Sequence, residues 1–588
     1  MERRFLITTA KYAAWRYNEP VVFLGEWCKI YSQKQKWESL DSKVASYRWD
    51  DRKQLFEDYK YLASIYNKLL PAIAKELNKI QNVNHSMRYW GIILGPWLST
   101  FIQIIFERFH QIKIVSEEYI ISGTLISEIQ TEEIVPNDML DFANSFISDD
   151  WNHHIYSMLI KDFSNIPYTK LGDEKKTNLI KQNPYSSKSF FKKQIFKILK
   201  IFHRRKDIVF VDFPLDPFNQ LKLLIKYGCL IEKLPKKNSK EINVNYLMRK
   251  WEIGIVPENE FENILSKFIP LQIPILYLEG YQSMVEFCEK ICLSNNPKSI
   301  QTSYITYNEE FKFWAADKIE KGTILNIFQH GGGYGIGKWI SNEELEINAA
   351  DNFYSWGWVN KEQCKVQALG ILKANSFKER SSYNQEYALL ILGTNLRYSY
   401  KLYSETISKQ WLNYFSDQKI FINTLTLELR KKIKVKLYPT DYGWNDQIRY
   451  KEEFPEICFE TGNASLKKLS KKSRVIISTY NSTTFLETLS LNIPSIIYWD
   501  PEFWELRDIA IPYFEKLSKV GVFHDSPVSA AMHLNKVWDD IFSWWNTEET
   551  QEAVRNFVQF FCYTYPDILN DLMIKINKSN FKIEKVDF

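Results

Sequence analysis

Strand-like and helix-like patterns alternate along the C-terminal part of the chain, and this alternation constrains the fold more than any other feature. Buried-strand patterns "YALLILGTN", "KIKVKLYP" and "RVIIS" are separated by helical patterns such as "SKQWLNYFSDQKIFINTL". Strands that alternate with helices indicate a parallel, doubly wound sheet. Further strand patterns precede them: "PVVFLG", which we take as the first strand, then "DIVFVDFPL", "IPILYL" and "TILNIFQHGGG". The sequence therefore predicts an α/β fold.

The length of 588 residues predicts more than one domain. We expect an N-terminal α/β domain with helical insertions over 1–360, a linker over 361–386, a C-terminal α/β domain over 387–545, and a helix and tail over 546–588. The N-terminal half is rich in helical patterns, and "MRYWGIILGPWLSTFIQIIFERFHQI" reads as a buried helix around a break at Gly95-Pro96. A cleft between two such domains is a natural ligand site.

Charge and cysteine usage exclude several classes of protein. A formal net charge of only +5 over the whole length gives no basis for bulk nucleic-acid binding. The 7 cysteines are dispersed without a C-x-x-C pair, which suggests reduced thiols and no zinc site. The N-terminus lacks a signal peptide's apolar core, and no apolar run reaches the ~18 residues of a membrane span. We therefore expect a cytoplasmic protein that needs no metal or cofactor.

A glycine-rich stretch, "QHGGGYGIGKW", follows the predicted strand "TILNIF". Gly332 to Lys338 fits G-x-x-x-x-G-K, but Trp339 stands where a P-loop needs serine or threonine. One interpretation is a turn that needs glycines for positive φ angles. The other is the edge of an active site, because ligands of α/β sheets lie beyond the carboxyl ends of strands. In that case the glycines let a ligand approach the backbone, and His330 is a candidate base.

A polar turn, "STYNSTT", lies between the strand pattern "RVIIS" and a helical pattern. Small hydroxyl side chains at the start of a helix favour anion binding, so Ser482, Thr483 and Thr484 are candidate phosphate contacts. Glu487 follows Thr484 by three residues and fits a capping box. The functional interpretation is that Glu487 accepts hydrogen bonds from a ribose.

Three cations are candidates to neutralise a donor diphosphate without a metal: Lys436, Arg397 and Arg449. Lys436 comes late in the strand pattern "KIKVK", and the segment after it is alternatively a proline-started turn with an aromatic plug. Glu26 ends the strand pattern "PVVFLG" and is a second candidate base, or else one half of a buried structural pair. His153 and His154 are interpreted as structural.

The stretch from Lys188 to Lys206 combines aromatic and basic residues at helical spacing. Such helices bind anionic membrane surfaces, and this would place the protein at the inner face of the cytoplasmic membrane. The alternative is a helix that packs its apolar side in the core and solvates its basic side.

Several of these stretches together resemble a family of transferases encoded in gene clusters for O-antigen and other bacterial surface polysaccharides. The resemblance is carried by "PVVFLGEWC", "YWGIILGPWL", "FQHGGGYG", "ADNFYSWGW", "LYPTDYGW" and "STYNSTTFLETLSLNIPSIIYWDPEFWELRD" and runs from about Phe5 to Phe560. The chain is more distantly similar to CDP-glycerol glycerophosphotransferases and to bacterial sialyl- and Kdo-transferases. These groups imply the GT-B arrangement, in which two Rossmann-like domains face a cleft and the C-terminal one binds the nucleotide.

The resemblance implies roles for particular residues. Gln329-His330-Gly331 looks like a Gln-His-Gly motif whose histidine is the base, and "STYNSTTFLE" resembles a Ser/Thr-rich motif before a helix. "KLYP" occupies the place of a Lys-x-His-Pro motif but has Tyr438 instead of histidine. The expected catalytic residues are His330 and Glu26. The expected substrate contacts are Lys436, Arg397, Arg449, Ser482, Thr483, Thr484, Glu487, Gln329, Gly331 and Gly332.

The implied function is a metal-independent glycosyltransferase of O-antigen, lipopolysaccharide or capsule synthesis. It would transfer a sugar from a nucleotide-activated, CMP-linked donor to a glycan or lipid-linked acceptor. One alternative is a glycerophosphotransferase-like enzyme with a CDP-linked donor. The other is a non-catalytic glycan-binding or scaffolding subunit, which Tyr438 in place of the motif histidine favours.

Overall fold

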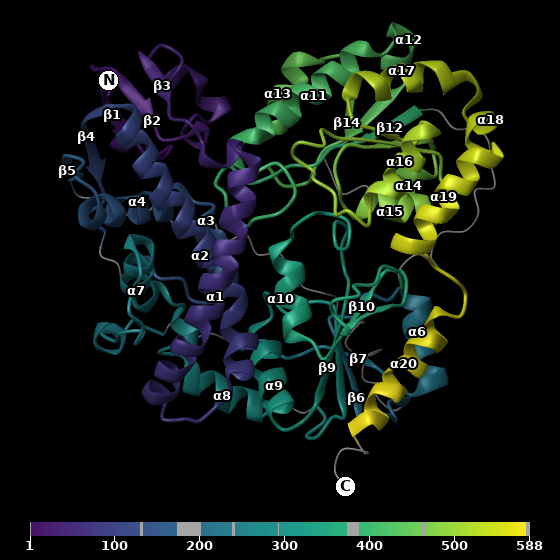
Figure 1. Ribbon diagram of the computed structural model, residues 1–588, viewed down its shortest axis with the longest axis horizontal. Coiled ribbons are helices and arrows are strands. Elements are labelled where there is room, and N and C mark those ends of the chain that lie inside the picture. Colours follow the sequence, from purple (N-terminus) through teal and green to yellow (C-terminus); the bar gives the residue numbers. More distant parts are fainter. Residues whose placement is uncertain are drawn as a thin grey trace. The chain divides into compact units, whose positions relative to one another are not determined.

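The computed structural model describes the chain except for residues 1, 130–132, 173–201, 238–241, 292, 373–386, 461–465 and 584–588. The fold divides into two compact units (Figure 1). The first unit consists of Met1–Phe213, Gln220–Asn326 and Arg397–Lys401, and the second of Pro214–Asn219, Ile327–Leu396 and Leu402–Phe588. The predicted boundary at 360–361 falls inside the second unit, and the predicted linker contains a strand at Val366–Ala368.

The first unit contains a five-stranded parallel sheet of order β3-β2-β1-β4-β5. Its strands are β1 (Arg3–Ile7), β2 (Val21–Phe23), β3 (Ser42–Val44), β4 (Ile120–Ile126) and β5 (Tyr168–Lys170). The prediction that "PVVFLG" is the first strand is wrong, because β1 precedes it. The two arginines of β1 make its sequence look unlike a buried strand. In the structure Arg4 is nevertheless buried, because it forms ion pairs with Glu2 and Asp41. Since β2 and β4 flank β1 on opposite sides, the topological switch point lies at the carboxyl ends of β1 and β4.

Long helices make the N-terminal half helix-rich, as predicted. They are α1 (Arg52–Gln81), α2 (Met87–Glu118), α3 (Met139–Phe146), α4 (Asp149–Phe163), α7 (Glu260–Gln272), α8 (Tyr281–Glu289) and α9 (Glu309–Glu320). Figure 1 shows α1 and α2 side by side. The predicted break at Gly95-Pro96 is wrong, because α2 continues through Pro96. The helix is long and apolar enough to cross a membrane, but 83% of its most apolar window is buried, as in a core helix.

A second sheet has six strands in the order β11-β10-β9-β8-β6-β7. Its strands are β6 (Ile208–Val211), β7 (Ile231–Glu232), β8 (Ser299–Thr302), β9 (Ile324–Phe328), β10 (Asn352–Ser355) and β11 (Val366–Ala368), and its connections include α6 (Pro217–Tyr227) and α10 (Ser341–Ala349). The pattern "IPILYL" does not form the predicted strand. It forms a 3-10 turn at Ile275–Tyr277 whose first N–H bonds the carbonyl of Pro136.

The third sheet is the one that the alternation in the C-terminal part predicts. It is parallel and has the order β14-β13-β12-β15-β16-β17. Its strands are β12 (Tyr387–Ile391), β13 (Ile433–Lys436), β14 (Cys458–Glu460), β15 (Ser473–Ser478), β16 (Ser495–Tyr498) and β17 (Phe523–His524). The chain moves outward from β12 on one side and returns on the other, so the switch point lies at the carboxyl ends of β12 and β15.

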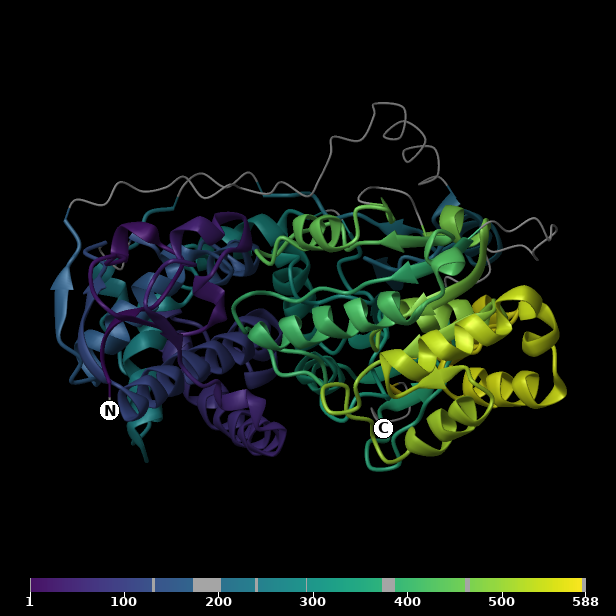
Figure 2. The same cartoon turned by 90° about the horizontal axis from the view of Figure 1, so that it is seen from above.

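Helices cover this third sheet. They are α11 (Trp411–Thr424), α12 (Leu427–Arg430), α13 (Asp446–Glu453), α14 (Leu466–Ser470), α15 (Thr483–Ser490), α16 (Ile511–Lys519), α17 (Pro527–Val537), α18 (Ile541–Trp545) and α19 (Glu548–Phe561). The helix α20 (Ile568–Ile583) follows them along the chain. The yellow C-terminal helices in Figure 2 include α16 and α19, which pack against each other. Parallel strands with helices between them confirm the predicted α/β fold class.

Candidate functional site

The glycine stretch lies against the start of α15 in the second unit. The backbone N–H of Gly332 donates to the Thr483 hydroxyl at 2.8 Å, although the two residues are 151 positions apart. A Cβ on Gly332 would lie 2.1 Å from the carbonyl carbon of Ser482 and 2.3 Å from the Thr483 nitrogen. Only glycine allows this approach. The glycine stretch and the polar turn, predicted separately, therefore form one site.

Two charged residues hold the glycine stretch in place. Glu343 on α10 is buried and accepts from the N–H of Gly335 at 2.7 Å. Arg507 pairs with Glu343 at 2.6 Å, and its Nε donates to the carbonyl of Gly337 at 2.8 Å. Burial raises the pKa of Glu343, and the charge of Arg507 opposes that shift. The backbone of the stretch is thus fixed before any ligand arrives.

His330 lies beside a buried carboxylate. Its Nδ1 is 3.8 Å from Oε1 of Glu346 on α10, and its side chain is 29% exposed whereas that of Glu346 is 2% exposed. Burial raises the pKa of Glu346 well above its ordinary value. A distance of 3.8 Å is within reach of an ion pair but is too long for a hydrogen bond. A partly exposed histidine backed by a buried carboxylate is the geometry of a general base with an orienting group.

Glu346 was not among the residues singled out from the sequence. The signal was present, because "EELE" places Glu343 and Glu346 three residues apart and hence on one side of a helix. Only the fold shows that this side meets the glycine stretch at one position and His330 at the other.

Gln329 supports the site rather than facing a ligand. Its Oε1 accepts from the backbone N–H of Trp356 and from the indole of Trp358, both at 2.9 Å. Its Nε2 donates to the carbonyl of Gly331 at 2.9 Å. The amide is 2% exposed. These bonds anchor the glycine stretch, and direct contact of Gln329 with substrate stays a prediction.

The polar turn joins β15 to α15. Ser482 is the N-cap residue, but its side chain makes no capping hydrogen bond. The capping-box interpretation of Glu487 is wrong, because α15 begins at Thr483 and the third helical position is therefore Phe485. Ser482, Thr483, Thr484 and Glu487 are all half-buried. A helix N-terminus without a side-chain cap, next to a glycine backbone, has the chemistry of an anion site.

Lys436 ends β13 at the same level of the sheet as the polar turn. Ile391 of β12 pairs with Lys436 on one side and with Ser478 on the other. Two strand spacings separate Lys436 from Ser478, which is about 10 Å. The pKa of Glu460 on the adjacent strand is lowered by its hydrogen bond with Lys434, with a further contribution from the charge of Lys436. Lys436 therefore lies at the predicted edge of the sheet.

The segment after β13 is a turn with an aromatic plug, as the alternative interpretation predicted. Asp441 accepts from the N–H of Gly443 at 2.7 Å, and Trp444 is buried with its ring stacked 5.1 Å from that of Trp411. Arg449 donates from Nε to the carbonyl of Trp444 at 2.8 Å and lies over the Trp411 ring. These contacts give Arg449 a structural place, and its contact with a donor stays a prediction.

The switch point of the third sheet carries buried polar groups that sequence reasoning missed. Thr479 donates to the carbonyl of Ile391 at 2.9 Å, and the N–H of Gly393 donates to the Tyr414 hydroxyl at 2.8 Å. Asp446, the first residue of α13, is buried nearby. Burial first, and then the charge of Asp441, raise the pKa of Asp446 to about 7. A cavity of about 20 Å³ lies at this edge between Gly393, Thr394, Asn395, Glu405, Thr406, Trp411, Tyr414, Tyr480 and Trp504.

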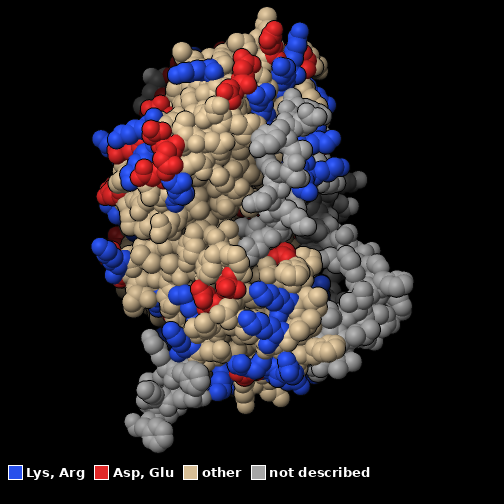
Figure 3. All heavy atoms as spheres, turned by 90° about the vertical axis from the view of Figure 1, so that its right-hand side faces the viewer, with Lys and Arg blue, Asp and Glu red and all other residues tan. Residues whose placement is uncertain are grey.

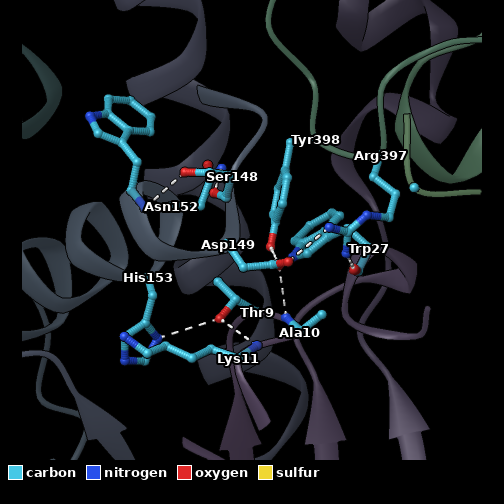
Figure 4. A network of polar contacts seen from close by, with 12 residues as sticks. Thr9, Ala10, Lys11, Trp27, Ser148, Asp149, Asn152, His153, Arg397 and Tyr398 are labelled. Atoms are coloured by element: carbon cyan, nitrogen blue, oxygen red, sulfur yellow. Dashed lines mark hydrogen bonds and ion pairs between the residues drawn. The ribbon is translucent and has the colours of Figure 1, made fainter. Parts of the chain in front are cut away.

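Arg397 belongs to a different site, in the first unit (Figure 4). Its Nη2 pairs with Asp149 at 2.9 Å, and its Nη1 donates to the carbonyl of Trp27. The Tyr398 hydroxyl donates to the same carboxylate at 2.5 Å. These contacts occupy the guanidinium and place Arg397 with the first unit rather than with the polar turn. Its role as a donor cation stays a prediction.

Figure 4 also shows the carboxyl end of β1. Asp149 accepts from the N–H of Ala10 at 3.0 Å, and Lys11 pairs with Asp150 at 3.1 Å. His153 is buried with its Nδ1 3.2 Å from the Thr8 hydroxyl, and burial lowers its pKa to about 3. A histidine that stays neutral and buried fits the structural interpretation.

Glu26 lies in a 3-10 turn, Glu26–Cys28, that follows β2. Its carboxylate is 23% exposed and pairs with Lys29 at 3.2 Å. This contact favours the structural-pair interpretation, and a role as base stays a prediction. Over the ranges that the structure describes, no group of three or more histidine, cysteine or acidic residues is placed to hold a metal ion. Residues 188–201 of the predicted basic helix lie outside the described residues.

Comparison with known proteins gives one strong match. A family model described as LIC12162 family transferase matches residues 4–576. A comparison with curated proteins gave no match. Similar solved structures include a variant of the wall teichoic acid polymerase TagF soaked with CDPG, at 12% identity and a TM-score of 0.32 over 68% of this chain and 98% of that one.

Two other solved structures are similar at the same level. MurG from Acinetobacter baumannii has 13% identity and a TM-score of 0.32 over 65% of this chain and 96% of its own. HepE from Anabaena, in complex with UDP and glucose, has 12% identity and a TM-score of 0.33 over 63% of this chain and 99% of its own. Likeness at these values carries no argument about the reaction.

Proposed function

Because the chain belongs to the LIC12162 family of transferases, we propose that it is a glycosyltransferase that moves a sugar from a nucleotide-activated donor to a glycan acceptor. Membership of the family confirms the predicted transferase and the resemblance on which that prediction rests. The CMP-linked donor, the GT-B arrangement and a place in O-antigen, lipopolysaccharide or capsule synthesis belong to the proposal.

The observation that carries the proposal is the contact between Gly332 and Thr483. It joins a glycine backbone to the N-terminus of α15, where the helix dipole favours negative charge. Lys436 supplies a cation at the same edge of the sheet. Glycine N–H groups, hydroxyls, a helix N-terminus and a lysine together suit the phosphate of a nucleotide-linked donor.

Besides a phosphate site, the transfer needs a base that activates the acceptor, and we assign this role to His330. In the proposed reaction, His330 takes the proton of an acceptor hydroxyl, whose oxygen then attacks the anomeric carbon of the donor sugar. The bond between that carbon and the phosphate oxygen breaks, and the nucleotide leaves with the electron pair as an anion held by the polar turn. The proton ends on His330, where the carboxyl group of Glu346 lies 3.8 Å from Nδ1 and orients the ring.

Calorimetric titration of the full chain with CMP, CDP and UDP tests the donor site. We expect at least one of them to bind, and Thr483→Val to weaken that binding by about tenfold, since a lost hydrogen bond to a charged group is worth about 1.5 kcal/mol or more. Thr424→Val is the matched control, because the Thr424 hydroxyl is exposed and bonds only its own helix in the described contacts.

Two results would contradict the proposal. If the parent protein binds none of the three nucleotides, a non-catalytic glycan-binding subunit is the better interpretation. If a nucleotide binds and the reaction product carries a phosphodiester by mass analysis, the hydroxyl attacks phosphorus, and the glycerophosphotransferase-like alternative holds.

A further inference from the structure

Helix α6 presents apolar side chains to solvent. Phe218 is 74% exposed, Leu221 47% and Ile225 62%. At 3.6 residues per turn these three positions fall within about 60° of one another. Leu223 and Leu224, on the other side of the helix, are buried. A surface helix normally turns a polar face outward, so α6, apolar on both sides, is exceptional.

Cations border this outward face. Lys222 and Lys226 follow Phe218 by four and eight residues and lie along one flank of the helix. The guanidinium of Arg204 donates to the carbonyl of Ile225 at 3.4 Å, and its backbone N–H donates to the carbonyl of Gly228 at 2.9 Å. Arg204 is thereby attached to the C-terminal turn of α6.

An exposed aromatic residue extends the apolar face. Phe202, which is 55% exposed, precedes Arg204 by two residues. On the lower part of the face drawn in Figure 3, lysine and arginine side chains lie among uncharged surface and a few acidic side chains. Apolar and basic side chains are therefore interleaved at this end of the helix.

Nearby acidic groups are engaged elsewhere. Asp216 caps the start of α6 by accepting from the N–H groups of Phe218 and Asn219. Asp207 pairs with Arg205 at 2.8 Å. The charge that borders Phe218, Leu221 and Ile225 is therefore predominantly positive.

We propose that the outward face of α6, together with Phe202 and Arg204, docks the protein on a bilayer that contains anionic lipid. The apolar side chains would enter the boundary between headgroups and acyl chains, and the cations would meet the headgroup phosphates. An acidic protein partner fits less well, because three side chains on one short helix cover far less than the ~800 Å² per partner of a stable interface. The proposal does not depend on the proposed reaction.

Sedimentation of the full chain with vesicles tests the docking surface. We expect binding to vesicles of phosphatidylglycerol and phosphatidylcholine in equal parts, little binding to pure phosphatidylcholine, and release at high salt. Phe218→Ser, Leu221→Ser and Ile225→Ser combined should abolish binding. Val528→Ser with Met532→Ser is the matched control, because these side chains are 43% and 61% exposed one turn apart on α17.

Removing the cations tests the electrostatic part. Lys222→Gln with Lys226→Gln should weaken binding by about fivefold for each cation, whereas Lys516→Gln with Lys519→Gln on α16 should leave it unchanged. Lys226, Lys516 and Lys519 are exposed and Lys222 is half-buried, and glutamine keeps most of the aliphatic stem, so thermal unfolding should shift little. If serine at the three apolar positions unfolds the protein, the lysine variants still test whether α6 binds anionic vesicles.

Three outcomes would overturn the proposal. In the first, the parent protein fails to bind the anionic vesicles. In the second, both α6 variants bind these vesicles as well as the parent does. Alternatively, analytical ultracentrifugation shows self-association that the serine variant abolishes while vesicles bind neither protein, in which case the face is an interface between copies of this chain.

Discussion

Polar groups follow the carboxyl end of β1 in the first unit, which we call the first edge, and the carboxyl ends of β9 and β15 in the second unit, which we call the second edge. The two edges use their polar groups in opposite ways. At the end of β1, Asp149 receives Arg397, Tyr398 and the backbone of Ala10, and the network is closed on itself. Beyond β9 and β15, in the second unit, the groups are a glycine backbone, an α15 N-terminus without a side-chain cap, and a histidine 3.8 Å from a buried carboxylate.

The contrast between the two edges indicates that one contributes to the stability of the fold and the other to ligand binding. Closed networks of buried charges hold elements together, because each charge already has its partner. Backbone N–H groups at a helix start without a side-chain cap, and a histidine whose side chain is 29% exposed, can still bind a ligand. We therefore expect substitutions at the first edge to act on unfolding and those at the second edge to act on binding and turnover.

The largest expected effect is on turnover at the second edge. His330→Ala should lower the transfer rate by about 10²–10⁴-fold, the usual contribution of a general base. Donor affinity should change little, because His330 acts on the acceptor. The measurement is turnover with saturating donor beside a nucleotide titration.

Glu26→Gln is the competing variant for the role of base. It should keep a near-full rate, since its carboxylate pairs with Lys29. If Glu26→Gln abolishes transfer while His330→Ala retains it, the base is Glu26 and the glycine stretch serves only the architecture of the second unit.

At the first edge we expect a loss of stability instead. Arg397→Met removes the cation that faces Asp149, and breaking a buried pair from one side costs about 3–5 kcal/mol. Urea unfolding should report this loss. Arg449→Met is the control. The half-buried guanidinium of Arg449 donates to the backbone carbonyl of Trp444, and the loss of a hydrogen bond of this kind should cost about 1 kcal/mol.

The double variant Arg397→Met with Asp149→Asn sharpens this test. It should recover part of the lost stability, because no charge is left without its partner. Were Arg397→Met instead to abolish nucleotide binding with normal unfolding, Arg397 would be a donor contact after all and the contrast between the two edges would fail.

A smaller effect follows from the raised pKa of Asp446. Because its folded pKa is about 7 and its unfolded pKa is about 3.9, the folded state holds the proton more tightly. Its contribution to stability is fully present below pH ~4 and is lost as the pH rises toward 7. Asp446→Asn should therefore stabilise the protein at pH 8 by about 2–4 kcal/mol.

Urea midpoints of both proteins across pH 4 to pH 8 are the measurement for Asp446. The parent curve should fall toward pH 8 more steeply than that of the variant. Parallel curves would show that Asp446 ionises normally and that the second edge carries no destabilising carboxyl group at this position.

Much of the fold was accessible from local patterns. Helices between short apolar strands predicted the parallel sheet of β12 to β17, because short apolar runs that alternate with longer helical patterns are typical of buried parallel strands. The same reasoning failed for β1, whose buried Arg4 is neutralised by Glu2 and Asp41 outside the strand. It failed as well for "IPILYL", because so short an apolar run does not distinguish a strand from a turn. It also failed at Pro96, since the packing of α2 outweighs the hydrogen bond that a proline removes.

The candidate site, too, has parts that the sequence predicted and parts that only the fold revealed. The sequence by itself determined the transferase family, the polar turn before α15 and the glycine stretch with His330, because each is a contiguous motif. Only the tertiary structure decided that Gly332 meets Thr483, that Glu346 stands behind His330 and that Arg397 is taken by Asp149. Such pairings join residues far apart in the chain, and their energy depends on burial and approach distance, which no local pattern records.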